Sequence, residues 1–200
     1  MAEYSEIHGE TILDNGRSQI VVYPDFWHPV DGVNLFAVED LTVRPPIVIG
    51  GAICNQNRDV GFFSDESAGY NYSGTTTGSK PLTPELRKIL EDVNFSLETS
   101  FNGILVNRYT TGHNSIGAHS DDARGLDPHN QTVACLSYGA ARTFRIRDKS
   151  TRRVVLDYTH MPGTLLVMQG DCQKDYTHEI PPQLRIKDER VSLTFRRHVR

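Results

Sequence analysis

Short runs in which hydrophobic and polar residues alternate dominate the second half of the chain. Alternate residues of an extended strand face the same side, so each run predicts a strand with one buried face. Turn residues separate the runs without an intervening helical pattern, which favours a jelly-roll barrel of two sheets. An immunoglobulin-like sandwich is the alternative, but it leaves the histidines and arginines of these strands unexplained. The predicted strands span residues 104–109, 132–138, 143–147, 154–158, 164–168 and 191–196.

A helix is predicted before these strands. Thr83 is a good N-cap residue, Pro84 suits the first helical position, and Glu85 lies in the first turn, where the helix dipole favours an acid. The apolar residues that follow recur at helical spacing and form one stripe: Leu86, Ile89, Leu90, Val93 and Leu97. We interpret this helix as packing scaffold. The fold class is therefore mainly β with flanking helices (α+β), built on a double-stranded β-helix or jelly-roll barrel.

The N-terminal part gives weaker patterns. Residues 19–23 and 47–49 predict short strands, each followed by turn-forming residues, and residues 31–41 predict a helix. No internal repeat or linker divides the chain. We therefore expect one domain over residues 1–200, with an N-terminal support segment at 1–50 and the jelly-roll core at 102–200.

Residues 52–80 are polar and rich in turn-forming residues, so we expect a loop region there. Loops held on a rigid scaffold often carry binding residues, and aromatic faces stack on nucleic-acid bases. The alternative is that the aromatic rings of this region only anchor the loop to the core. Four such rings lie in it: Phe62, Phe63, Tyr70 and Tyr72.

Composition narrows the class of protein. A chain of 200 residues with 38% hydrophobic and 23% charged residues is typical of one globular domain. The formal net charge of −4 argues against a generally basic nucleic-acid binder, although it is compatible with a local basic groove. Three cysteines without paired spacing predict reduced thiols. We find no signal-peptide pattern and no membrane-length apolar run, so we expect a monomeric intracellular protein, cytoplasmic or nuclear, that is not secreted.

The residues with the clearest chemistry lie in the middle of the chain. His119 and Asp121 flank one serine, and in an extended strand this spacing aims an imidazole and a carboxylate at one point. Two histidines and one carboxylate form the facial triad of many iron sites. A surface pair at a strand end is the alternative for this motif alone. His178 is the candidate third ligand and His160 is its rival, whereas His129 lies in a polar loop and is expected to be exposed.

The last predicted strand carries two arginines on one face. Arg190, Ser192, Thr194 and Arg196 alternate with three apolar residues, which fits a barrel wall with a polar interior. Arginine recognises carboxylates with two hydrogen bonds and stays charged when partly buried. A solvated edge strand is the alternative. A basic run at residues 142–153 favours phosphate-bearing substrates, although such runs are usually solvated surface.

These motifs together resemble the AlkB family, whose members are Fe(II)- and 2-oxoglutarate-dependent dioxygenases that remove alkyl groups from nucleic-acid bases. The resemblance covers residues 62–197 and rests on the ordered set Asn107-x-Tyr109, His119-x-Asp121, His178 and Arg190-x-Ser-x-Thr-x-Arg196. Two positions depart from the family pattern. Ser192 stands where the family usually carries asparagine, and Ala123 stands where many members have an acid.

The resemblance implies a role for each matched residue. Fe(II) is expected on His119, Asp121 and His178. The far carboxylate of 2-oxoglutarate is expected on Arg190 and Tyr109, and the near one on Arg196 and Asn107. Residues 51–80 match the nucleotide-recognition lid, and Ser192 lies among the cofactor-binding positions. The expected substrate contacts are Phe63, Tyr70, Tyr72 and Asp122, the last supplying negative charge in place of Ala123.

The implied activity is oxidative demethylation of 1-methyladenine and 3-methylcytosine, which uses O2 and releases formaldehyde, succinate and CO2. We expect single-stranded DNA as substrate, with RNA as a further candidate, because residues 54–59 pair Arg58 with Asp59 and carry no apolar finger. Phe62 and Phe63 are the rings that a duplex-opening enzyme would use. The alternatives are an oxygenase acting on protein or lipid, a non-catalytic nucleic-acid-binding module and a cupin-like metal protein. Arg190 and Arg196 argue against the last.

Overall fold

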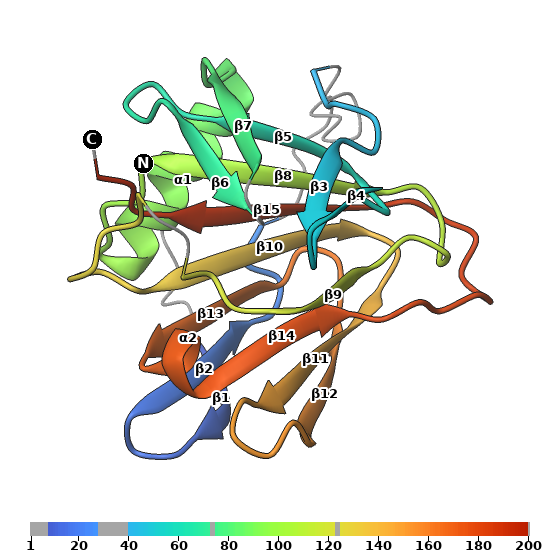
Figure 1. Cartoon of the computed structure of the whole chain (residues 1–200). Helices are drawn as coiled ribbons and strands as arrows, with labels where there is room; N and C mark the ends of the chain where they lie inside the picture. The colour runs from blue at the N-terminus through green and yellow to red at the C-terminus, as the bar shows by residue number, and fades with distance from the viewer. Residues whose placement is uncertain (1–7, 28–39, 73–74, 123–124, 200) are drawn as a thin grey trace.

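The computed structural model describes residues 8–27, 40–72, 75–122 and 125–199. A large sheet runs through the whole molecule (Figure 1). Its strands follow the order β1, β2, β13, β10, β15, β8, β5, β7, β6. Their bounds are β1 (Glu10–Asp14), β2 (Ser18–Tyr23), β5 (Asp59–Phe63), β6 (Gly69–Tyr72), β7 (Thr75–Lys80), β8 (Gly103–Tyr109), β10 (Val133–Gly139), β13 (Leu165–Gly170) and β15 (Arg190–Arg196).

A second, smaller sheet packs against one face of the large one. It has the order β12 (Val154–His160), β11 (Arg142–Asp148), β14 (Tyr176–Ile180), β9 (Ile116–His119). The core between the sheets mixes side chains of both, such as Val133 and Leu166 from the large sheet with Phe144 and Ile180 from the small one. The two layers form the predicted jelly-roll barrel, and the sandwich alternative is not needed.

The predicted helix covers the other face of the large sheet. α1 (Pro84–Leu97) begins after Thr83, whose side-chain oxygen accepts a hydrogen bond from the backbone N–H of Leu86 at 3.2 Å. Its apolar stripe is buried against the sheet, including the inward residues Leu193 and Phe195 of β15. The helix thus fixes one face of β15 by packing, which leaves the other face to line the barrel.

Some predictions were wrong. Residues 52–80 were expected to be a loop, but four strands lie within them, β4 to β7. β5 pairs with β8 along its whole length and β7 adds to β5 in parallel. The free edge of β8 therefore supplies hydrogen-bond partners that no local pattern reveals. The sequence also missed β1, β9 as a separate strand, β14 and the short helix α2 (Cys172–Asp175). The predicted helix at 31–41 lies largely outside the described residues.

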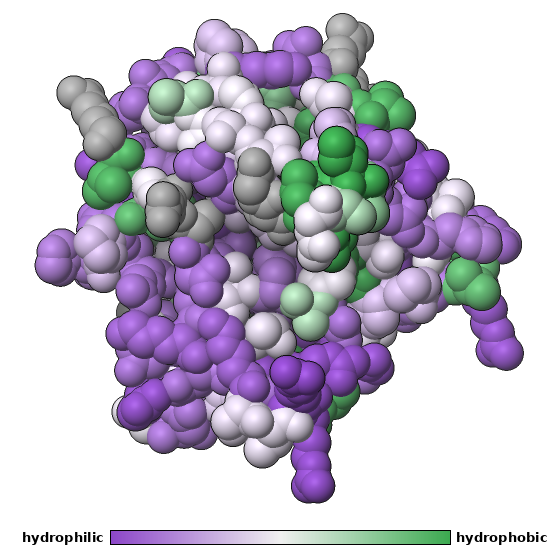
Figure 2. Space-filling model, in the orientation of Figure 1, coloured by the Kyte–Doolittle hydropathy of each residue, from purple (hydrophilic) through white to green (hydrophobic). Residues whose placement is uncertain are grey.

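A separate hairpin stands beside the barrel. β3 (Pro46–Ile49) and β4 (Ala52–Asn55) are joined by Gly50 and Gly51, whose φ angles of 57° and 84° are those of a tight hairpin turn. Val48, Ile49 and Ile53 are exposed on it, Ile53 to 80%. Figure 2 shows hydrophobic surface over this hairpin. In the part of the chain that the structure describes, no helix is long and apolar enough to span a membrane.

Candidate active site

Two strands of the small sheet bring the predicted metal ligands together. β9 and β14 pair so that His119 lies opposite His178. His178 Nε2 lies 3.6 Å from Asp121 Oδ2, and His119 Nε2 lies 3.9 Å from Asp121 Oδ1. One ligand atom of each residue lies within 4.8 Å of the others, so the three could hold one metal ion. Asp121 differs from the prediction in one respect, because it lies in a bend after β9 and not in the strand.

The protonation states suit metal binding. Burial lowers the pKa of His178 to about 3, with a further contribution from His119, and burial also lowers the pKa of His119. Burial alone would raise the pKa of Asp121, but Arg196 and the two histidines hold it well below its usual range. The Nδ1 atom of His119 lies 2.8 Å from the Gly117 carbonyl, which leaves Nε2 free of a proton in the neutral ring. Two neutral imidazoles therefore face a carboxylate anion.

The rival histidines do not join this group. His160 is fully buried, and its Nε2 lies 3.0 Å from the Thr164 carbonyl. His129 is exposed, as predicted. Among the described residues, the group of His119, Asp121 and His178 is the only one with metal-ligand geometry. Asp121 Oδ2 is buried and has no hydrogen-bond partner among the residues that the structure describes, so it has a lone pair for a metal ion.

The two arginines of β15 lie inside the barrel. β15 is central, between β10 and β8, so the edge-strand alternative is wrong. Arg190 donates from Nε to Ser137 at 2.9 Å and lies over the Tyr109 ring at 5.2 Å, but its buried Nη1 and Nη2 have no hydrogen-bond partner in the described part of the chain. Arg196 donates from Nη2 to Asp121 at 2.6 Å, and no described residue pairs with its Nε or Nη1. Each guanidinium group thus retains donors for an anion.

The other predicted residues line this cavity or its entrance, with one exception. Asn107, Tyr109 and Ser192 lie on its wall. Tyr70 directs its hydroxyl towards Asp121 Oδ1 at 3.4 Å, and the Tyr72 ring meets His119 edge to face at 5.7 Å. Asp122 is exposed at the entrance, where Lys149 lies 3.6 Å away.

Phe63 is the exception. Its ring is 1% exposed and packs in the core beneath α1, so the structure does not bring it to the site. Phe62 is also buried, which leaves neither ring free to insert into a duplex. Ala123 lies outside the described residues, so the structure does not address its departure from the family pattern.

Sequence reasoning missed Arg58. Its Nε donates to Asn107 Oδ1 at 2.7 Å, and its guanidinium carbon lies 5.5 Å from the centre of the Tyr72 ring. The sequence suggested that Asp59 neutralises it, but Asp59 accepts two hydrogen bonds from Arg108. A buried cation therefore lies where the cavity meets the open groove.

The basic run at 142–153 is only in part a free surface cluster. Arg142 is buried, donates to the carbonyls of Thr111, Asn114 and Pro181, and lies 5.7 Å from the centre of the Tyr109 ring. Arg145 pairs with Asp157 and Arg147 with Glu179. The first residue of the run is thus structural, and acids neutralise two of the others.

An open groove leads to the metal ligands. Its volume is about 1030 Å³, and His119, Tyr72 and Arg58 lie on its floor. Ile47 and Ile49 of the hairpin form part of its wall. The geometry therefore offers a wide entrance for a polymer, which adjoins an inner cavity with spare cationic donors.

Comparison with known proteins agrees with this geometry. A family model described as the 2OG-Fe(II) oxygenase superfamily matches residues 34–196. The human "DNA oxidative demethylase ALKBH2" is 35% identical over 144 residues, which cover 68% of this chain and 54% of that protein. The chain belongs to the AlkB family of this superfamily. The cofactor set of the superfamily is Fe(II), 2-oxoglutarate and O2.

Further relatives of this AlkB-family chain are similarly distant. The human "Alpha-ketoglutarate-dependent dioxygenase alkB homolog 3" is 35% identical over 136 residues, covering 64% of this chain and 47% of that protein. The ALKBH2 protein of Arabidopsis thaliana is 30% identical over 179 residues, covering 76% of this chain and 57% of that protein. The chain thus spans about half the length of these relatives. "The structure of OsALKBH1" matches with a TM-score of 0.54 and 16% identity, over 78% of this chain and 86% of that one, and shows the fold.

Proposed function

We propose that this chain demethylates N-alkylated bases of nucleic acids oxidatively, with 1-methyladenine and 3-methylcytosine as substrates and formaldehyde, succinate and CO2 as products. The observation that carries the proposal is a set of buried polar atoms, at the metal ligands and in the adjoining cavity, that have no hydrogen-bond partner among the described residues. Asp121 offers a carboxylate oxygen, while Arg190 and Arg196 offer guanidinium donors. Leaving a buried polar group unpaired costs about 1–3 kcal/mol, so such groups are retained where a ligand completes them.

The donor set fits Fe(II). Two neutral imidazoles and one carboxylate on one side of a metal leave its other positions open. When bound, Fe(II) and 2-oxoglutarate supply the O2-dependent oxidation that hydroxylates a substrate methyl group. The protein's part is to hold His119 and His178 by strand pairing and to keep Asp121 ionised through Arg196.

The arginine positions suit a dicarboxylate. We assign the far carboxylate of 2-oxoglutarate to Arg190, helped by the Tyr109 hydroxyl, because this guanidinium is buried with two free nitrogens. Arg196 and Asn107 take the near carboxylate, beside Asp121. Ser192 faces the same cavity with a side chain shorter than the asparagine usual in the family.

The groove suits a nucleotide taken out of its stack. A base entering beside Tyr72 and His119 would lie on an aromatic face, close to the metal ligands. Tyr70 also lines this space. Its hydroxyl is directed towards Asp121, and the Arg196 guanidinium group lies over its ring. Asp122 at the entrance supplies the negative charge that a cationic methylated base requires, reduced by Lys149. One chain contributes every residue of this site, and we propose that it acts as a monomer.

We propose single-stranded DNA as the preferred substrate, with RNA as a further one, since the net charge of −4 gives little non-specific hold on a duplex. The exposed apolar hairpin favours a second candidate, duplex DNA. Val48, Ile49 and Ile53 are exposed on the hairpin, and Ile49 also lines the groove, so the hairpin offers the apolar finger that the sequence did not predict. Apolar side chains can wedge between base steps and offset the cost of opening them.

The decisive assay measures formaldehyde and succinate release on oligonucleotides that carry one methylated base, with and without Fe(II) and 2-oxoglutarate. Release that requires both supports the proposal. Matched single- and double-stranded substrates at equal salt separate the two candidates. Binding without turnover would indicate a non-catalytic module, and succinate release with protein or lipid substrates alone would indicate an oxygenase of another class.

A further inference from the structure

The metal-binding carboxylate lies beyond the strand that leads to it. β9 ends at His119, whose backbone is fixed by its pairing with His178. Asp121 follows two residues later and belongs to no strand, so no ladder of backbone hydrogen bonds positions it. Ligands must be held within about 0.5 Å of their working geometry, so another contact must fix the main chain here.

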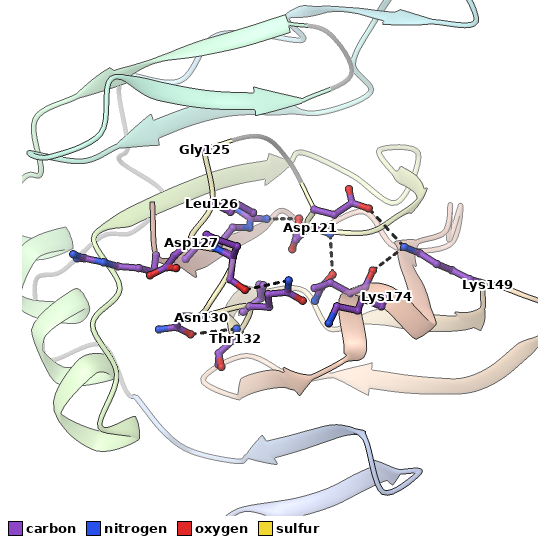
Figure 3. A pocket seen from close by; sticks show the side chains of 15 residues that line it. Asp121, Gly125, Leu126, Asp127, Asn130, Thr132, Lys149 and Lys174 are labelled. Atoms are coloured by element: carbon purple, nitrogen blue, oxygen red, sulfur yellow. Dashed lines mark hydrogen bonds and ion pairs between the residues drawn. The ribbon is translucent and has the colours of Figure 1, made fainter. Parts of the chain in front are cut away.

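Packing does not supply this contact on every side. A cavity of about 350 Å³ borders Asp121 and Arg196, and its lining includes Gln173 and Lys149 (Figure 3). Among the described residues, polar contacts therefore help to fix the position of Asp121 on this side.

Gln173 makes the polar contact to the main chain. Its Oε1 accepts a hydrogen bond from the backbone N–H of Asp121 at 2.8 Å, and its side-chain nitrogen contacts Met168 Sδ at 3.7 Å. The residue is 3% exposed and lies on α2. It is not part of the lining of the central cavity, and its direct contact with a metal ligand is the one to the main chain of Asp121.

The main chain of α2, which carries Gln173, is itself held by hydrogen bonds. Lys149 Nζ donates to the Gln173 carbonyl at 2.7 Å, and the Lys149 backbone N–H donates to the Asp175 carbonyl at 2.9 Å. Ser120 Oγ donates to the Tyr176 carbonyl at 2.7 Å, directly after α2. The loop that carries Asp121 is thus tied to α2 at two successive residues.

We propose that Gln173 is a positioning residue of the metal site: its side-chain oxygen holds the main chain of Asp121 so that Oδ2 faces His119 and His178. The inference rests on the proposed metal site. Residues that hydrogen-bond a metal ligand without touching the metal are important for binding. Their mutation typically lowers metal affinity about 10- to 100-fold.

The test measures Mn(II) binding to the full chain by the signal of the free ion in electron paramagnetic resonance, with the melting temperature of the metal-free protein beside it. We expect Gln173→Leu to weaken Mn(II) binding about 10- to 100-fold. Gln173→Glu keeps an acceptor oxygen and should recover most of that affinity. Gln169→Leu is the matched control, because Gln169 bonds Gln19 and not the site, and should bind Mn(II) like the wild type.

The outcomes separate this inference from the proposed function. Wild-type protein that does not bind Mn(II) would refute the metal site and the inference together. Binding in the wild type with equal binding in Gln173→Leu would overturn the inference alone. Failure of Gln173→Glu to recover affinity would also overturn it. The inference would also be overturned if Gln169→Leu lost Mn(II) affinity and melting temperature to the same extent as Gln173→Leu. A general packing defect would then explain the result.

Discussion

Asp121 buries one carboxylate oxygen, and Arg190 and Arg196 each bury two guanidinium nitrogens, without a hydrogen-bond partner among the described residues. A fold that only had to be stable would pair or replace such groups, because burying them unpaired costs free energy. Asp121 lies with the two metal-binding histidines and both arginines line the adjoining cavity, which indicates that a metal ion and an anion complete these groups.

The first prediction separates His178 from His160. We expect His178→Ala to reduce turnover below detection and to abolish metal binding while the fold persists, because strand pairing holds the backbone of β14. His160→Ala should lower stability by about 2 kcal/mol through the cavity it opens, yet retain turnover and metal binding. Formaldehyde release and circular dichroism of both variants provide the measurement. Activity in His178→Ala combined with inactivity in His160→Ala would show that the third ligand is assigned wrongly.

The second prediction concerns Arg190. Arg190→Ala should raise the KM for 2-oxoglutarate by the loss of a desolvated charge pair, about 2–5 kcal/mol. Arg190→Lys should recover only part of it, because an ammonium group lacks the planar fork of arginine. Steady-state kinetics with varied 2-oxoglutarate at saturating oligonucleotide provide the measurement. An unchanged KM in Arg190→Ala would remove this arginine from the co-substrate site.

At the scale of elements, β15 supports the site, whereas the β3–β4 hairpin offers a surface for binding. β15 is held on one face by α1 and presents its polar face to the cavity. Within the described part of the chain, the β3–β4 hairpin pairs with no other strand, and it carries exposed apolar side chains, of which Ile49 lines the groove. An apolar surface of this kind on a small separate element marks an interaction site.

The prediction for the hairpin concerns the choice between single-stranded and double-stranded substrates. The double variant Ile49→Ser, Ile53→Ser should lose turnover on duplex substrates more than on single strands, because extruding a base from a duplex costs a few kcal/mol that an apolar wedge offsets. Val155→Ser on β12 is the control, since Val155 is exposed but does not line the groove. Equal losses on both substrates would show that the hairpin serves binding in general and not duplex opening.

At the scale of the whole molecule, several histidines are buried in the neutral state. Burial lowers the pKa of His160 to about 3, with a smaller effect from Arg190, and lowers that of His198 to about 4. A histidine whose pKa is lower in the folded than in the unfolded protein takes up protons preferentially on unfolding. Its stabilising contribution is complete above the unfolded pKa of about 6.5 and declines as the pH falls towards the folded value.

We therefore expect the free energy of unfolding to fall between pH 7 and pH 5, by about 2 kcal/mol for His160 alone. Urea unfolding of the metal-free protein at both pH values provides the measurement. His160→Leu should reduce this pH dependence by a similar amount, whereas His129→Gln, at an exposed position, should leave it unchanged. Stability that rises as the pH falls over this range would contradict the buried neutral state of His160.

The sequence by itself determined the elements whose reason is local. Thr83 and Pro84 begin a helix whose apolar stripe is set by a period of 3.6 residues, and the alternation from Arg190 to Arg196 assigns each residue of β15 to one face. The order and spacing of the histidine, aspartate and arginine motifs carried the family resemblance. Their meeting at one site is tertiary, because the pairing of β9 with β14 brings His178 to His119.

Tertiary structure alone decided the features that depend on distant partners. Residues 59–63 and 75–80 became strands because β8 and β5 offer an edge to pair with, and Phe63 entered the core because that pairing turns it towards α1. Arg58 reached Asn107 because Arg108, 49 residues from Asp59, takes the neighbouring acid. Burial and pairing over such separations are set by the packing of whole sheets, to which no local pattern of residues is sensitive.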